Sequence, residues 1–388
     1  MTTLKPLTSS NLQPSNPVTL EPLKEGWRWV RLGEVCEITM GQSPPGASYN
    51  SDGLGVPLLN GPTEFGPINP TPVQWTISPT RFAEPGDILL CVRGATTGRK
   101  NIADRRYCVG RGLAAIQGRN EQATTSFLWF VLDIFTGSLI GQTSGSTFPN
   151  LPGEKLKRVE IPLPPLPEQN RIAAKIQELM QEVERARTAC EKQLEAAKAL
   201  PAAYLREVFE SEETKKWERK RLREGCLFEY GTGLPDRDRT GGSVPVFASN
   251  GIVGYHNIAI TQAPIIIIGR KGSIGQINYS EVPCWPIDTT YYIDPSKTQC
   301  DLPWLYWLLK WLRLDLLNKA TGVPGLNRED AYSQIIPFPS VAVQKRIASE
   351  LKEKMAEVEK LRISIEKQLE AINALPQVTL RKAFRGEL

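Results

Sequence analysis

Glu191-Lys192-Gln193-Leu194-Glu195-Ala196 is the stretch that decides the fold, because the same residues return in the same order at positions 366–371. An earlier segment also repeats, since positions 27–36 and 217–226 both open on Trp, share Arg-Leu in the middle and close on Cys. The earlier pair is 190 positions apart (217 − 27) and the later pair 175 (366 − 191), so the sequence between the two anchors has changed length. The repeat therefore predicts that each half of the chain consists of a variable body followed by a preserved helical tail.

The tails carry a heptad pattern. After the Pro-rich stretch at 161–167 the composition changes to Glu, Lys, Arg, Ala and Leu, which predicts a long helix that starts near Glu168. Apolar residues then recur at alternating spacings of four and three, which predicts a seam between two helices. The seam positions we expect are Ile172, Ile176, Leu179 and Val183 in the first helix and Ile347, Leu351, Val358, Leu361 and Ile365 in the second.

Because one helix leads from the first body to the second and the other follows the second body, packing them together most simply makes them antiparallel. At 1.5 Å per residue, roughly 40 residues give a rod of about 60 Å. Pro201 and Pro376 occupy matching places, and each is expected to kink or restart its helix. An ordinary long helical hairpin remains the alternative interpretation of the seams.

The bodies are rich in Gly and Pro and contain short apolar runs, such as 87–92, that predict strands. Positions 127–135 and their counterparts at 304–312 predict helices. We therefore expect an α+β protein in which two mixed α/β bodies, related by a pseudo-twofold internal repeat, are separated by two long antiparallel coiled-coil helices.

Composition sets broad limits on the class of protein. The 388 residues are enough for two cores. The 47 basic and 42 acidic residues give a net charge of +5, which is compatible with a polyanionic partner without identifying one. The seven cysteines lack a Cys-x-x-Cys pair and there is a single histidine, so we expect no metal site and no disulfide framework, and a cytoplasmic location.

The hydropathy pattern bears on secretion and on membrane insertion. Positions 1–24 are rich in Pro, Ser and Thr and lack a continuous apolar stretch, which predicts a flexible leader instead of a secretory signal. The most apolar windows, 265–268 and 304–317, are too short or too often broken by charge to cross a membrane.

Two matched loops are the candidate nucleic-acid contacts. Positions 92–100 correspond to 269–276, and each loop follows an apolar strand. Glycines let the backbone approach another surface, while Arg and Lys bind phosphate or a guanine edge. The candidate residues, which include basic residues outside these loops and one serine of a second pair of loops, are Arg93, Thr96, Thr97, Arg99, Lys100, Arg105, Arg111, Ser146, Arg237, Arg270, Lys271 and Ser273. The alternative is a pair of hairpins with solvated charges, and the glycine spacing does not fit a phosphate-binding P-loop.

A second pair of loops, 144–150 and 321–327, offers small polar side chains that could meet DNA. We favour slightly the alternative that each is a turn whose terminal Asn begins a short helix.

Catalytic residues are not predicted. His256 follows Tyr255 in a turn-like stretch, where we expect it on the surface or in a loop, so it offers no partner to a cysteine nucleophile. The sequence contains no His-Glu-x-x-His, no carboxylates at metal-ligand spacing, no Gly-x-Gly-x-x-Gly after a strand and no Asn-Pro-Pro-aromatic tetrad. We expect the chain to catalyse no reaction of its own.

Taken together, the chain resembles the specificity subunit of a type I restriction-modification system. The resemblance rests on Ile161-Pro162-Leu163-Pro164-Pro165-Leu166-Pro167-Glu168-Gln169-Asn170-Arg171-Ile172-Ala173, on its echo at 336–348 with Gln344, Arg346 and Ile347, and on the closing segment 382–388. It covers nearly everything after residue 26. The second copy departs at 340–343, which puts only the local start of the second helix in doubt.

The resemblance implies a non-catalytic reader of a bipartite, asymmetric double-stranded DNA target. It divides the chain into a leader at 1–24, target recognition domains at 25–166 and 213–341, and spacer helices at 167–212 and 342–388. It also implies partners: two methyltransferase subunits docked on the helices, which hold S-adenosylmethionine, and motor-nuclease subunits that can join. No cofactor is expected in this chain. Two half-sites in inverted orientation would lie about one DNA turn, 34 to 36 Å, apart.

Two alternative hypotheses stay open from the sequence. One is a coiled-coil scaffold whose globular ends bind proteins instead of DNA, which would show no salt-sensitive DNA binding. The other is an enzyme with an unrecognised site in the Gly-rich bodies, for which activity of the purified chain alone would be the sign.

Overall fold

The computed structural model of the chain describes residues 23–119, 121–141, 150–317 and 325–388. Two compact units are distinguished, Met1–Ala189 with Leu369–Leu388 (unit 1) and Cys190–Gln368 (unit 2). The predicted leader at 1–24 lies outside the described residues except at its end. There Leu23 packs on the core of unit 1 and Lys24 pairs with Glu168 at 3.2 Å, so these two residues belong to the folded unit.

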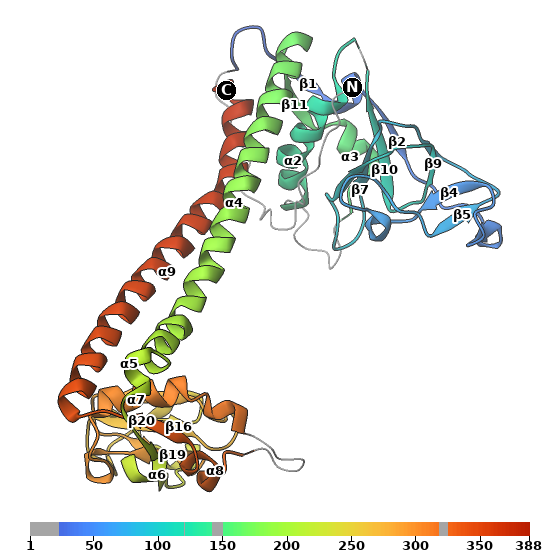
Figure 1. The fold of residues 1–388 in the computed structure, drawn as a ribbon. Helices are drawn as coiled ribbons and strands as arrows, with labels where there is room; N and C mark the ends of the chain where they lie inside the picture. Colours follow the sequence, from blue (N-terminus) through green and yellow to red (C-terminus); the bar gives the residue numbers. More distant parts are fainter. Residues whose placement is uncertain (1–22, 120, 142–149, 318–324) are drawn as a thin grey trace. The chain divides into compact units, whose positions relative to one another are not determined.

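The described residues of unit 1 form three sheets (Figure 1). Their orders are β1-β11, β2-β10-β7-β8 and β3-β5-β4-β9-β6. The strands are β1 (Arg28–Arg31), β2 (Cys36–Met40), β3 (Tyr49–Asn50), β4 (Val56–Leu59), β5 (Gln74–Thr76), β6 (Phe82–Ala83), β7 (Ile88–Cys91), β8 (Lys100–Ile102), β9 (Tyr107–Val109), β10 (Leu113–Gly118) and β11 (Glu160–Leu163). The helices within this body are α1 (Leu32–Val35), α2 (Thr125–Gly141) and α3 (Gly153–Lys157).

Unit 2 has sheets of order β12-β20, β13-β19-β16-β17 and β15-β14-β18. The strands are β12 (Glu218–Arg221), β13 (Glu229–Tyr230), β14 (Val244–Ala248), β15 (Gly251–His256), β16 (Ile265–Gly269), β17 (Ile277–Ser280), β18 (Trp285–Pro286), β19 (Thr290–Ile293) and β20 (Ile335–Phe338). Its short helices are α5 (Glu212–Lys215), α6 (Leu222–Gly225), α7 (Leu302–Trp311) and α8 (Arg328–Tyr332). Across both units the 3-10 helices are η1 (Gly46–Ser48), η2 (Pro62–Glu64), η3 (Asp236–Asp238), η4 (Pro295–Lys297) and η5 (Leu314–Leu317).

The predicted strands and helices of the bodies are confirmed. The run at 87–92 forms β7, which is buried along its whole length, and 265–268 forms the equally buried β16. Alternation is absent from both because each central strand is covered on both faces. The expected helices at 127–135 and 304–312 are α2 and α7.

The long helices are α4 (Leu166–Phe209) and α9 (Val341–Phe384), drawn in green and red in Figure 1. Contacts within unit 2 show that they run antiparallel, as predicted. Cys190 Sγ lies 3.5 Å from the carbonyl oxygen of Ile365, Glu207 pairs with Lys354 at 3.6 Å, and Glu213 pairs with Arg346 at 3.3 Å.

The seam is buried mainly near the bodies. In unit 1, Ile172 and Ile176 share a core with Leu380 and Phe384, and in unit 2 Ile347 and Leu351 share a core with Phe209. Val358 and Ile365 are also buried, whereas Leu179 and Val183 are half-buried.

The prediction for Leu361 is wrong, because 46% of its surface is exposed. Leu361 lies between Val358 and Ile365, which are one heptad apart and both buried. In this part of the seam the heptad position of Val358 and Ile365 is therefore covered, and the second apolar position, that of Leu361, is not. The next residue, Arg362, is more covered at 34% and pairs with Glu359 and Glu366.

Neither proline restarts its helix. Pro201 lies inside α4 and Pro376 inside α9, and both helices continue beyond them. The four changed positions at 340–343 are also tolerated, since α9 begins at Val341 directly after Ser340. A proline has no N–H group to donate, so each helix loses one main-chain hydrogen bond there. Packing of the apolar face against the neighbouring helix offsets that loss and keeps the helix continuous.

Candidate nucleic-acid interface

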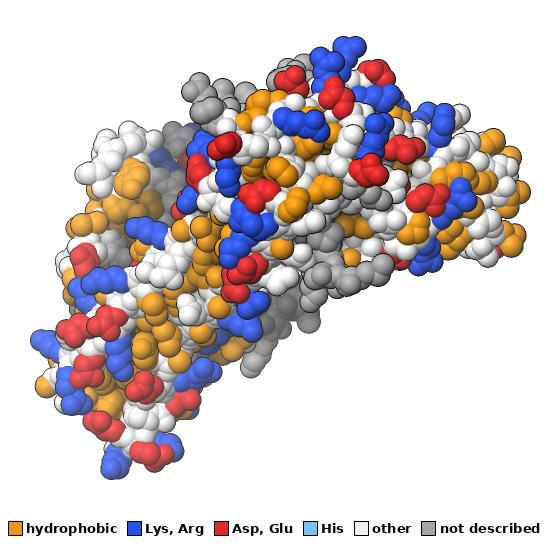
Figure 2. All heavy atoms as spheres, turned by 90° about the horizontal axis from the view of Figure 1, so that it is seen from above, with side chains coloured by type: hydrophobic (Ala, Val, Ile, Leu, Met, Phe, Trp, Pro, Cys, Tyr) orange, Lys and Arg blue, Asp and Glu red, His pale blue; other side chains and the backbone are white. Residues whose placement is uncertain are grey.

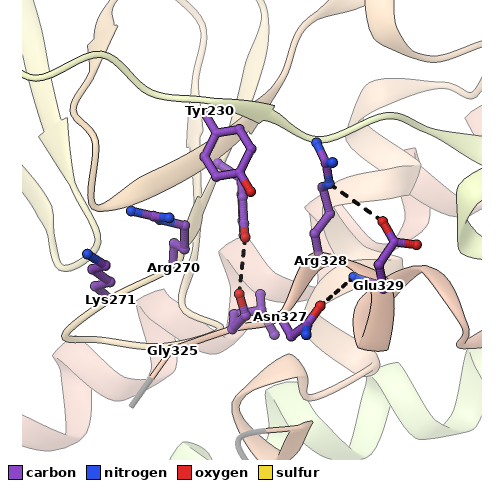
Figure 3. Close-up of a pocket in the computed structure, with 9 residues that line it drawn as sticks. Tyr230, Arg270, Lys271, Gly325, Asn327, Arg328 and Glu329 are labelled. Carbon is purple, nitrogen blue, oxygen red and sulfur yellow. Dashed lines mark hydrogen bonds and ion pairs between the residues drawn. The ribbon is translucent and has the colours of Figure 1, made fainter. Parts of the chain in front are cut away.

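The loop that follows β16 forms one wall of a pocket in unit 2 (Figure 3). The pocket has a volume of about 550 Å³. It is lined by Tyr230, Arg270, Lys271, Tyr291, Gly325, Leu326, Asn327, Arg328 and Glu329. Four separate stretches of sequence therefore meet there: the end of β13, the loop after β16, strand β19, and the segment that leads into α8.

Two arginines flank one tyrosine in this pocket. The guanidinium carbon of Arg270 lies 5.2 Å from the ring centroid of Tyr230, and that of Arg328 lies 5.3 Å from the same ring. Figure 3 shows Tyr230 between the two arginine side chains. The ring stays accessible, since 49% of Tyr230 is exposed. Cation–π contact holds both guanidinium groups near the ring and leaves nitrogen atoms for a ligand.

The contacts extend beyond Tyr230 on both sides. Arg270 also lies 5.9 Å from the ring of Tyr291, and Arg328 lies 5.8 Å from that of Tyr332. Arg223 in turn lies 5.9 Å from Tyr332. We call these six alternating residues the Arg–Tyr cluster: Arg223, Tyr332, Arg328, Tyr230, Arg270 and Tyr291.

Main-chain hydrogen bonds fix the position of the cluster. The N–H of Leu326 donates to the carbonyl of Arg270 at 2.8 Å, and the hydroxyl of Tyr291 donates to the carbonyl of Leu326 at 3.1 Å. Burial raises the pKa of Tyr291 to about 12, and the neighbouring Tyr230 phenol acts in the same direction. The Tyr291 phenol is therefore neutral at pH 7 and does not balance the arginine charge.

The same backbone register recurs in unit 1. In unit 2, Tyr291 of β19 is paired with Tyr230 on one side and with Ile268 on the other. In unit 1, Ala114 of β10 is paired in the same way with Met40 and Leu90. The N–H of Leu151 donates to Val92 at 2.8 Å, as that of Leu326 does to Arg270.

This register corrects the alignment of the two loops. Arg270 corresponds to Val92 and Lys271 to Arg93, whereas the sequence match had paired Arg270 with Arg93. A one-residue difference in the length of the loops misled the comparison. The positions of unit 1 that correspond to the Arg–Tyr cluster are Gly33, Lys157, Gly153, Met40, Val92 and Ala114.

Comparison with known proteins now decides the family. The family model described as type I restriction modification DNA specificity domain matches the chain twice, over residues 24–195 and 205–371. The chain belongs to the type I restriction-modification specificity family. The two matches correspond to the two copies of the internal repeat.

Individual relatives agree with this assignment. Over 156 residues the chain is 40% identical to the putative type I restriction enzyme MjaX specificity subunit of Methanocaldococcus jannaschii, a match that covers 40% of this chain and 36% of that protein. It is 23% identical to the type I restriction enzyme EcoDI specificity subunit of Escherichia coli over 410 residues, which covers 93% of this chain and 88% of that protein.

Solved structures share the fold. One, from work on complex assembly and conformational transition of the type I R-M system, superposes with a TM-score of 0.77 and covers 95% of this chain and 100% of that chain. The HsdS subunit from Thermoanaerobacter tengcongensis gives a TM-score of 0.69, covering 94% and 98%. Both are 23% identical to this chain, so the likeness concerns the fold.

Lys100 is one predicted DNA contact that the structure contradicts. Its side chain is 3% exposed, its Nζ pairs with Asp133 at 2.5 Å, and it lies 4.2 Å from the ring of Trp129. Burial lowers the pKa of Lys100, while Asp133 favours the charged form. Lys100 is the first residue of β8, whose alternation turns this side chain inward against α2. It therefore packs inside unit 1 as one partner of a buried ion pair.

The other candidates of unit 1 lie on the surface or outside the described residues. Arg93, Thr96, Arg99 and Arg111 are exposed. Thr97 donates its hydroxyl to the carbonyl of Gly94 at 2.7 Å and so helps to shape the loop. Arg105 is 60% exposed and pairs with Asp104 at 3.4 Å. Ser146 lies outside the residues that the structure describes. DNA contact by the exposed side chains stays a prediction.

In unit 2, Arg270 and Lys271 line the pocket, whereas Ser273 and Arg237 do not appear among its lining residues. Arg237 is 86% exposed beside Asp238 on η3. Sequence reasoning missed Tyr230, Arg328 and Arg223, because they come from segments far from the β16 loop. The available signal was the repeat itself, since positions that differ between two copies of one frame are candidates for specificity.

Of the second pair of loops, positions 144–149 and 321–324 lie outside the described residues, so the structure describes Asn150 and positions 325–327 alone. Asn327 begins α8, as favoured, and its side chain accepts a hydrogen bond from the N–H of Glu329 at 2.8 Å. Asn150 instead forms a β-bridge with Arg93, and Pro152 is the N-cap of α3. The predicted helix start at the terminal Asn is thus confirmed in unit 2 and wrong in unit 1.

The expectation for His256 is also wrong. It is the last residue of β15 and is 9% exposed, because strand pairing places it opposite Val244. Its ring packs edge-on against Trp285 at 5.2 Å, and its Nδ1 lies 3.1 Å from the hydroxyl of Thr240. These contacts give it a packing role in unit 2.

Charges of both signs are interspersed on the face drawn in Figure 2, with no large area of one sign. All seven cysteines are unpaired and buried. Among the described residues no group of His, Cys, Asp and Glu is arranged to hold a metal ion. No helix in this part of the chain has the length and apolarity needed to cross a membrane.

Proposed function

We propose that the chain is the non-catalytic DNA-recognition subunit of a type I restriction-modification complex, and that its two target recognition domains bind the two halves of a bipartite, asymmetric target. The observation that carries the proposal is the double match to the DNA specificity family over two bodies that share the order of their two-stranded and four-stranded sheets. The unlike side chains at corresponding positions, such as Tyr230 and Met40, support two different half-sites.

Affinity in this proposal comes chiefly from phosphate contacts and falls with salt, while base-edge contacts discriminate at about 1–3 kcal/mol per mismatch. The helices α4 and α9 join the bodies and set the spacing between half-sites. Because the opposite ends of each helix lie in different units, its length acts on both bodies.

The helices are also the proposed docking sites of two methyltransferase subunits. Apolar side chains that the seam leaves uncovered on α9 support this: Leu361, Ile363, Leu375 and Val378 are 41–46% exposed. S-adenosylmethionine would be held by those subunits, and motor-nuclease subunits would join the same complex in the cytoplasm.

Sequencing of modified bases tests the proposal. The chain is expressed with the type I methyltransferase subunit of the same host in cells that lack other adenine methylation. We expect methyladenine at one bipartite, asymmetric motif and salt-sensitive DNA binding by the complex. Absence of both would favour the protein-binding scaffold, and methylation or cleavage by the purified chain alone would favour an enzyme.

A further inference from the structure

The pocket beside Tyr230 carries more positive charge than its own residues balance. Its lining includes the cations Arg270, Lys271 and Arg328 and a single acid, Glu329. Glu329 lies 3.9 Å from the Nε of Arg328, a distance at the limit of an ion pair. Two guanidinium groups are thus held on one ring with little neutralisation, an arrangement that an anion would stabilise.

Unsatisfied hydrogen-bond donors point to the same ligand chemistry. The Nε atoms of Arg270 and Arg328 are both buried and have no hydrogen-bond partner among the described residues. A buried donor without an acceptor costs free energy, and the cost is larger for a charged group. The guanidinium group of arginine is suited to the oxygens of a phosphate.

Unit 1 has the same backbone arrangement as unit 2 at this place but different side chains. Met40 stands where unit 2 has Tyr230, and a Cβ added to Gly153, at the position of Arg328, would lie 2.8 Å from the side chain of Met40. Val92 replaces Arg270. The backbone frame is common, and the arginines and tyrosines belong to the second copy.

From these observations, and resting on the function proposed above, we infer that the Tyr230 pocket binds a phosphate group of the DNA backbone at the second half-site, held between Arg270 and Arg328. The tyrosine ring keeps both guanidinium groups in place before DNA arrives, which reduces the entropy lost on binding. Because unit 1 has Val92 and Gly153 at the two arginine positions, the contact belongs to the second half-site alone.

The main experiment uses the full chain in complex with its methyltransferase subunits and a duplex that contains the methylated motif. The double variant Arg270→Gln/Arg328→Gln is compared with wild type by fluorescence anisotropy over a range of salt concentrations. We expect an affinity loss of about tenfold or more and a salt slope that is smaller by about 1, because a phosphate contact releases counterions. The loss of affinity should be equally large for a duplex in which the base sequence of the second half-site has been changed, because a phosphate contact does not read the bases.

Two variants serve as controls. Arg270→Lys/Arg328→Lys keeps the charges and should retain the wild-type salt slope with a smaller loss of affinity. Arg219→Gln removes an exposed charge of the same unit outside the pocket and should leave affinity within about twofold. Circular dichroism and thermal unfolding establish that each variant is folded.

A second measurement uses inorganic phosphate alone with the full chain. Phosphate should raise the Tm of wild type more than that of the Gln variant if the pocket accepts the anion. Equal shifts would overturn phosphate binding in the pocket. A larger shift for wild type, with DNA affinity unchanged in the variant, would assign the pocket to free phosphate and overturn the DNA contact.

The remaining outcomes separate this inference from the proposed function. Relaxed preference at one base pair with an unchanged salt slope would mean that the arginines contact a base, and would overturn the phosphate contact. If the Gln variant bound DNA with the affinity of wild type, the phosphate contact in the pocket would be overturned and the proposed function would stand. Absence of DNA binding by the wild-type complex would overturn the function itself.

Discussion

Gln169 and Gln344 make the same pair of hydrogen bonds in the two units. Each side chain is fully buried in the first turn of its long helix, α4 or α9. Their Nε2 atoms donate to the carbonyl oxygens of Pro164 and Pro339, both at 2.9 Å. Their Oε1 atoms accept from the N–H groups of Thr124 and Asp301, at 2.9 and 2.8 Å.

These bonds attach each long helix to its body. Thr124 precedes α2 and Asp301 is the N-cap of α7, so each glutamine binds a main-chain group at the start of a core helix. The glutamine of the repeated Gln-x-Arg-Ile motif thus joins helix and body by hydrogen bonds that bury no charge.

Replacing either glutamine should destabilise its unit. Gln169→Ala or Gln344→Ala leaves a buried N–H without an acceptor, and we expect a loss of about 1–3 kcal/mol in the free energy of unfolding. Urea unfolding of the full chain measures it. Gln193→Ala, on the exposed surface of α4, is the control and should be nearly neutral. Neutral behaviour of both buried variants would contradict the attachment role.

The buried pair of Lys100 and Asp133 makes a second prediction. Lys100→Ala should cost about 3–5 kcal/mol, because it leaves a carboxylate largely buried without its partner. The double variant Lys100→Met/Asp133→Leu should recover most of that loss in thermal unfolding. Double-variant complexes should keep wild-type affinity for DNA. Loss of DNA affinity in this folded double variant would show that Lys100 contacts DNA after all.

The seam provides a matched pair of leucines on α9. Leu351 is fully buried and Leu361 is 46% exposed. Leu351→Ala should therefore cost about 2–5 kcal/mol, whereas Leu361→Ala should change the free energy of unfolding by less than about 0.5 kcal/mol. Chemical denaturation of the isolated chain distinguishes them. Equal costs would mean that Leu361 packs in the seam in solution.

Glu168 should make stability depend on acid pH. Hydrogen bonds from Arg171 at 2.7 Å and Lys24 at 3.2 Å lower the pKa of Glu168 from 4.5 to about 2. Since the folded-state pKa is the lower one, the stabilisation is present above pH 4.5 and is lost as pH falls towards about 2.

The comparison is between wild type and Glu168→Gln. At pH 7 we expect wild type to be more stable by about 1 kcal/mol, a value reduced for solvent screening because Arg171 is 47% exposed. The difference should vanish between about pH 4.5 and about 2 in urea unfolding. A constant difference across that range would contradict the ion-pair origin.

Helix length should set the spacing of the DNA target. Deleting a few residues from the middle of α4 or α9 is expected to change the permitted gap between half-sites and leave the half-site sequences unchanged. Methylome sequencing reads both quantities. An unchanged gap together with new half-sites would refute the role of the helices as a spacer.

Much of the fold was predictable from local patterns. The proline run at 161–167 predicts a helix from Glu168 and a heptad repeat marks its apolar face, so α4 and α9 could be located within two residues of their starts, although α4 begins at Leu166 and includes Pro167. Strands β7 and β16 were visible as continuous apolar runs. The candidate site was only half visible, because Arg270 and Lys271 lie in a recognisable loop while Tyr230 and Arg328 lie elsewhere in the sequence.

The sequence alone determined that the chain is an internal repeat with two bodies and two antiparallel helices, because proline, heptad spacing and repetition act through neighbouring residues. The tertiary structure decided which charged side chains are free to bind a ligand. Lys100 is buried, whereas Arg270 and Arg328 meet on Tyr230, and strand register and loop length bring about both results. Burial and pocket formation depend on residues distant in sequence, so no local pattern could have specified them.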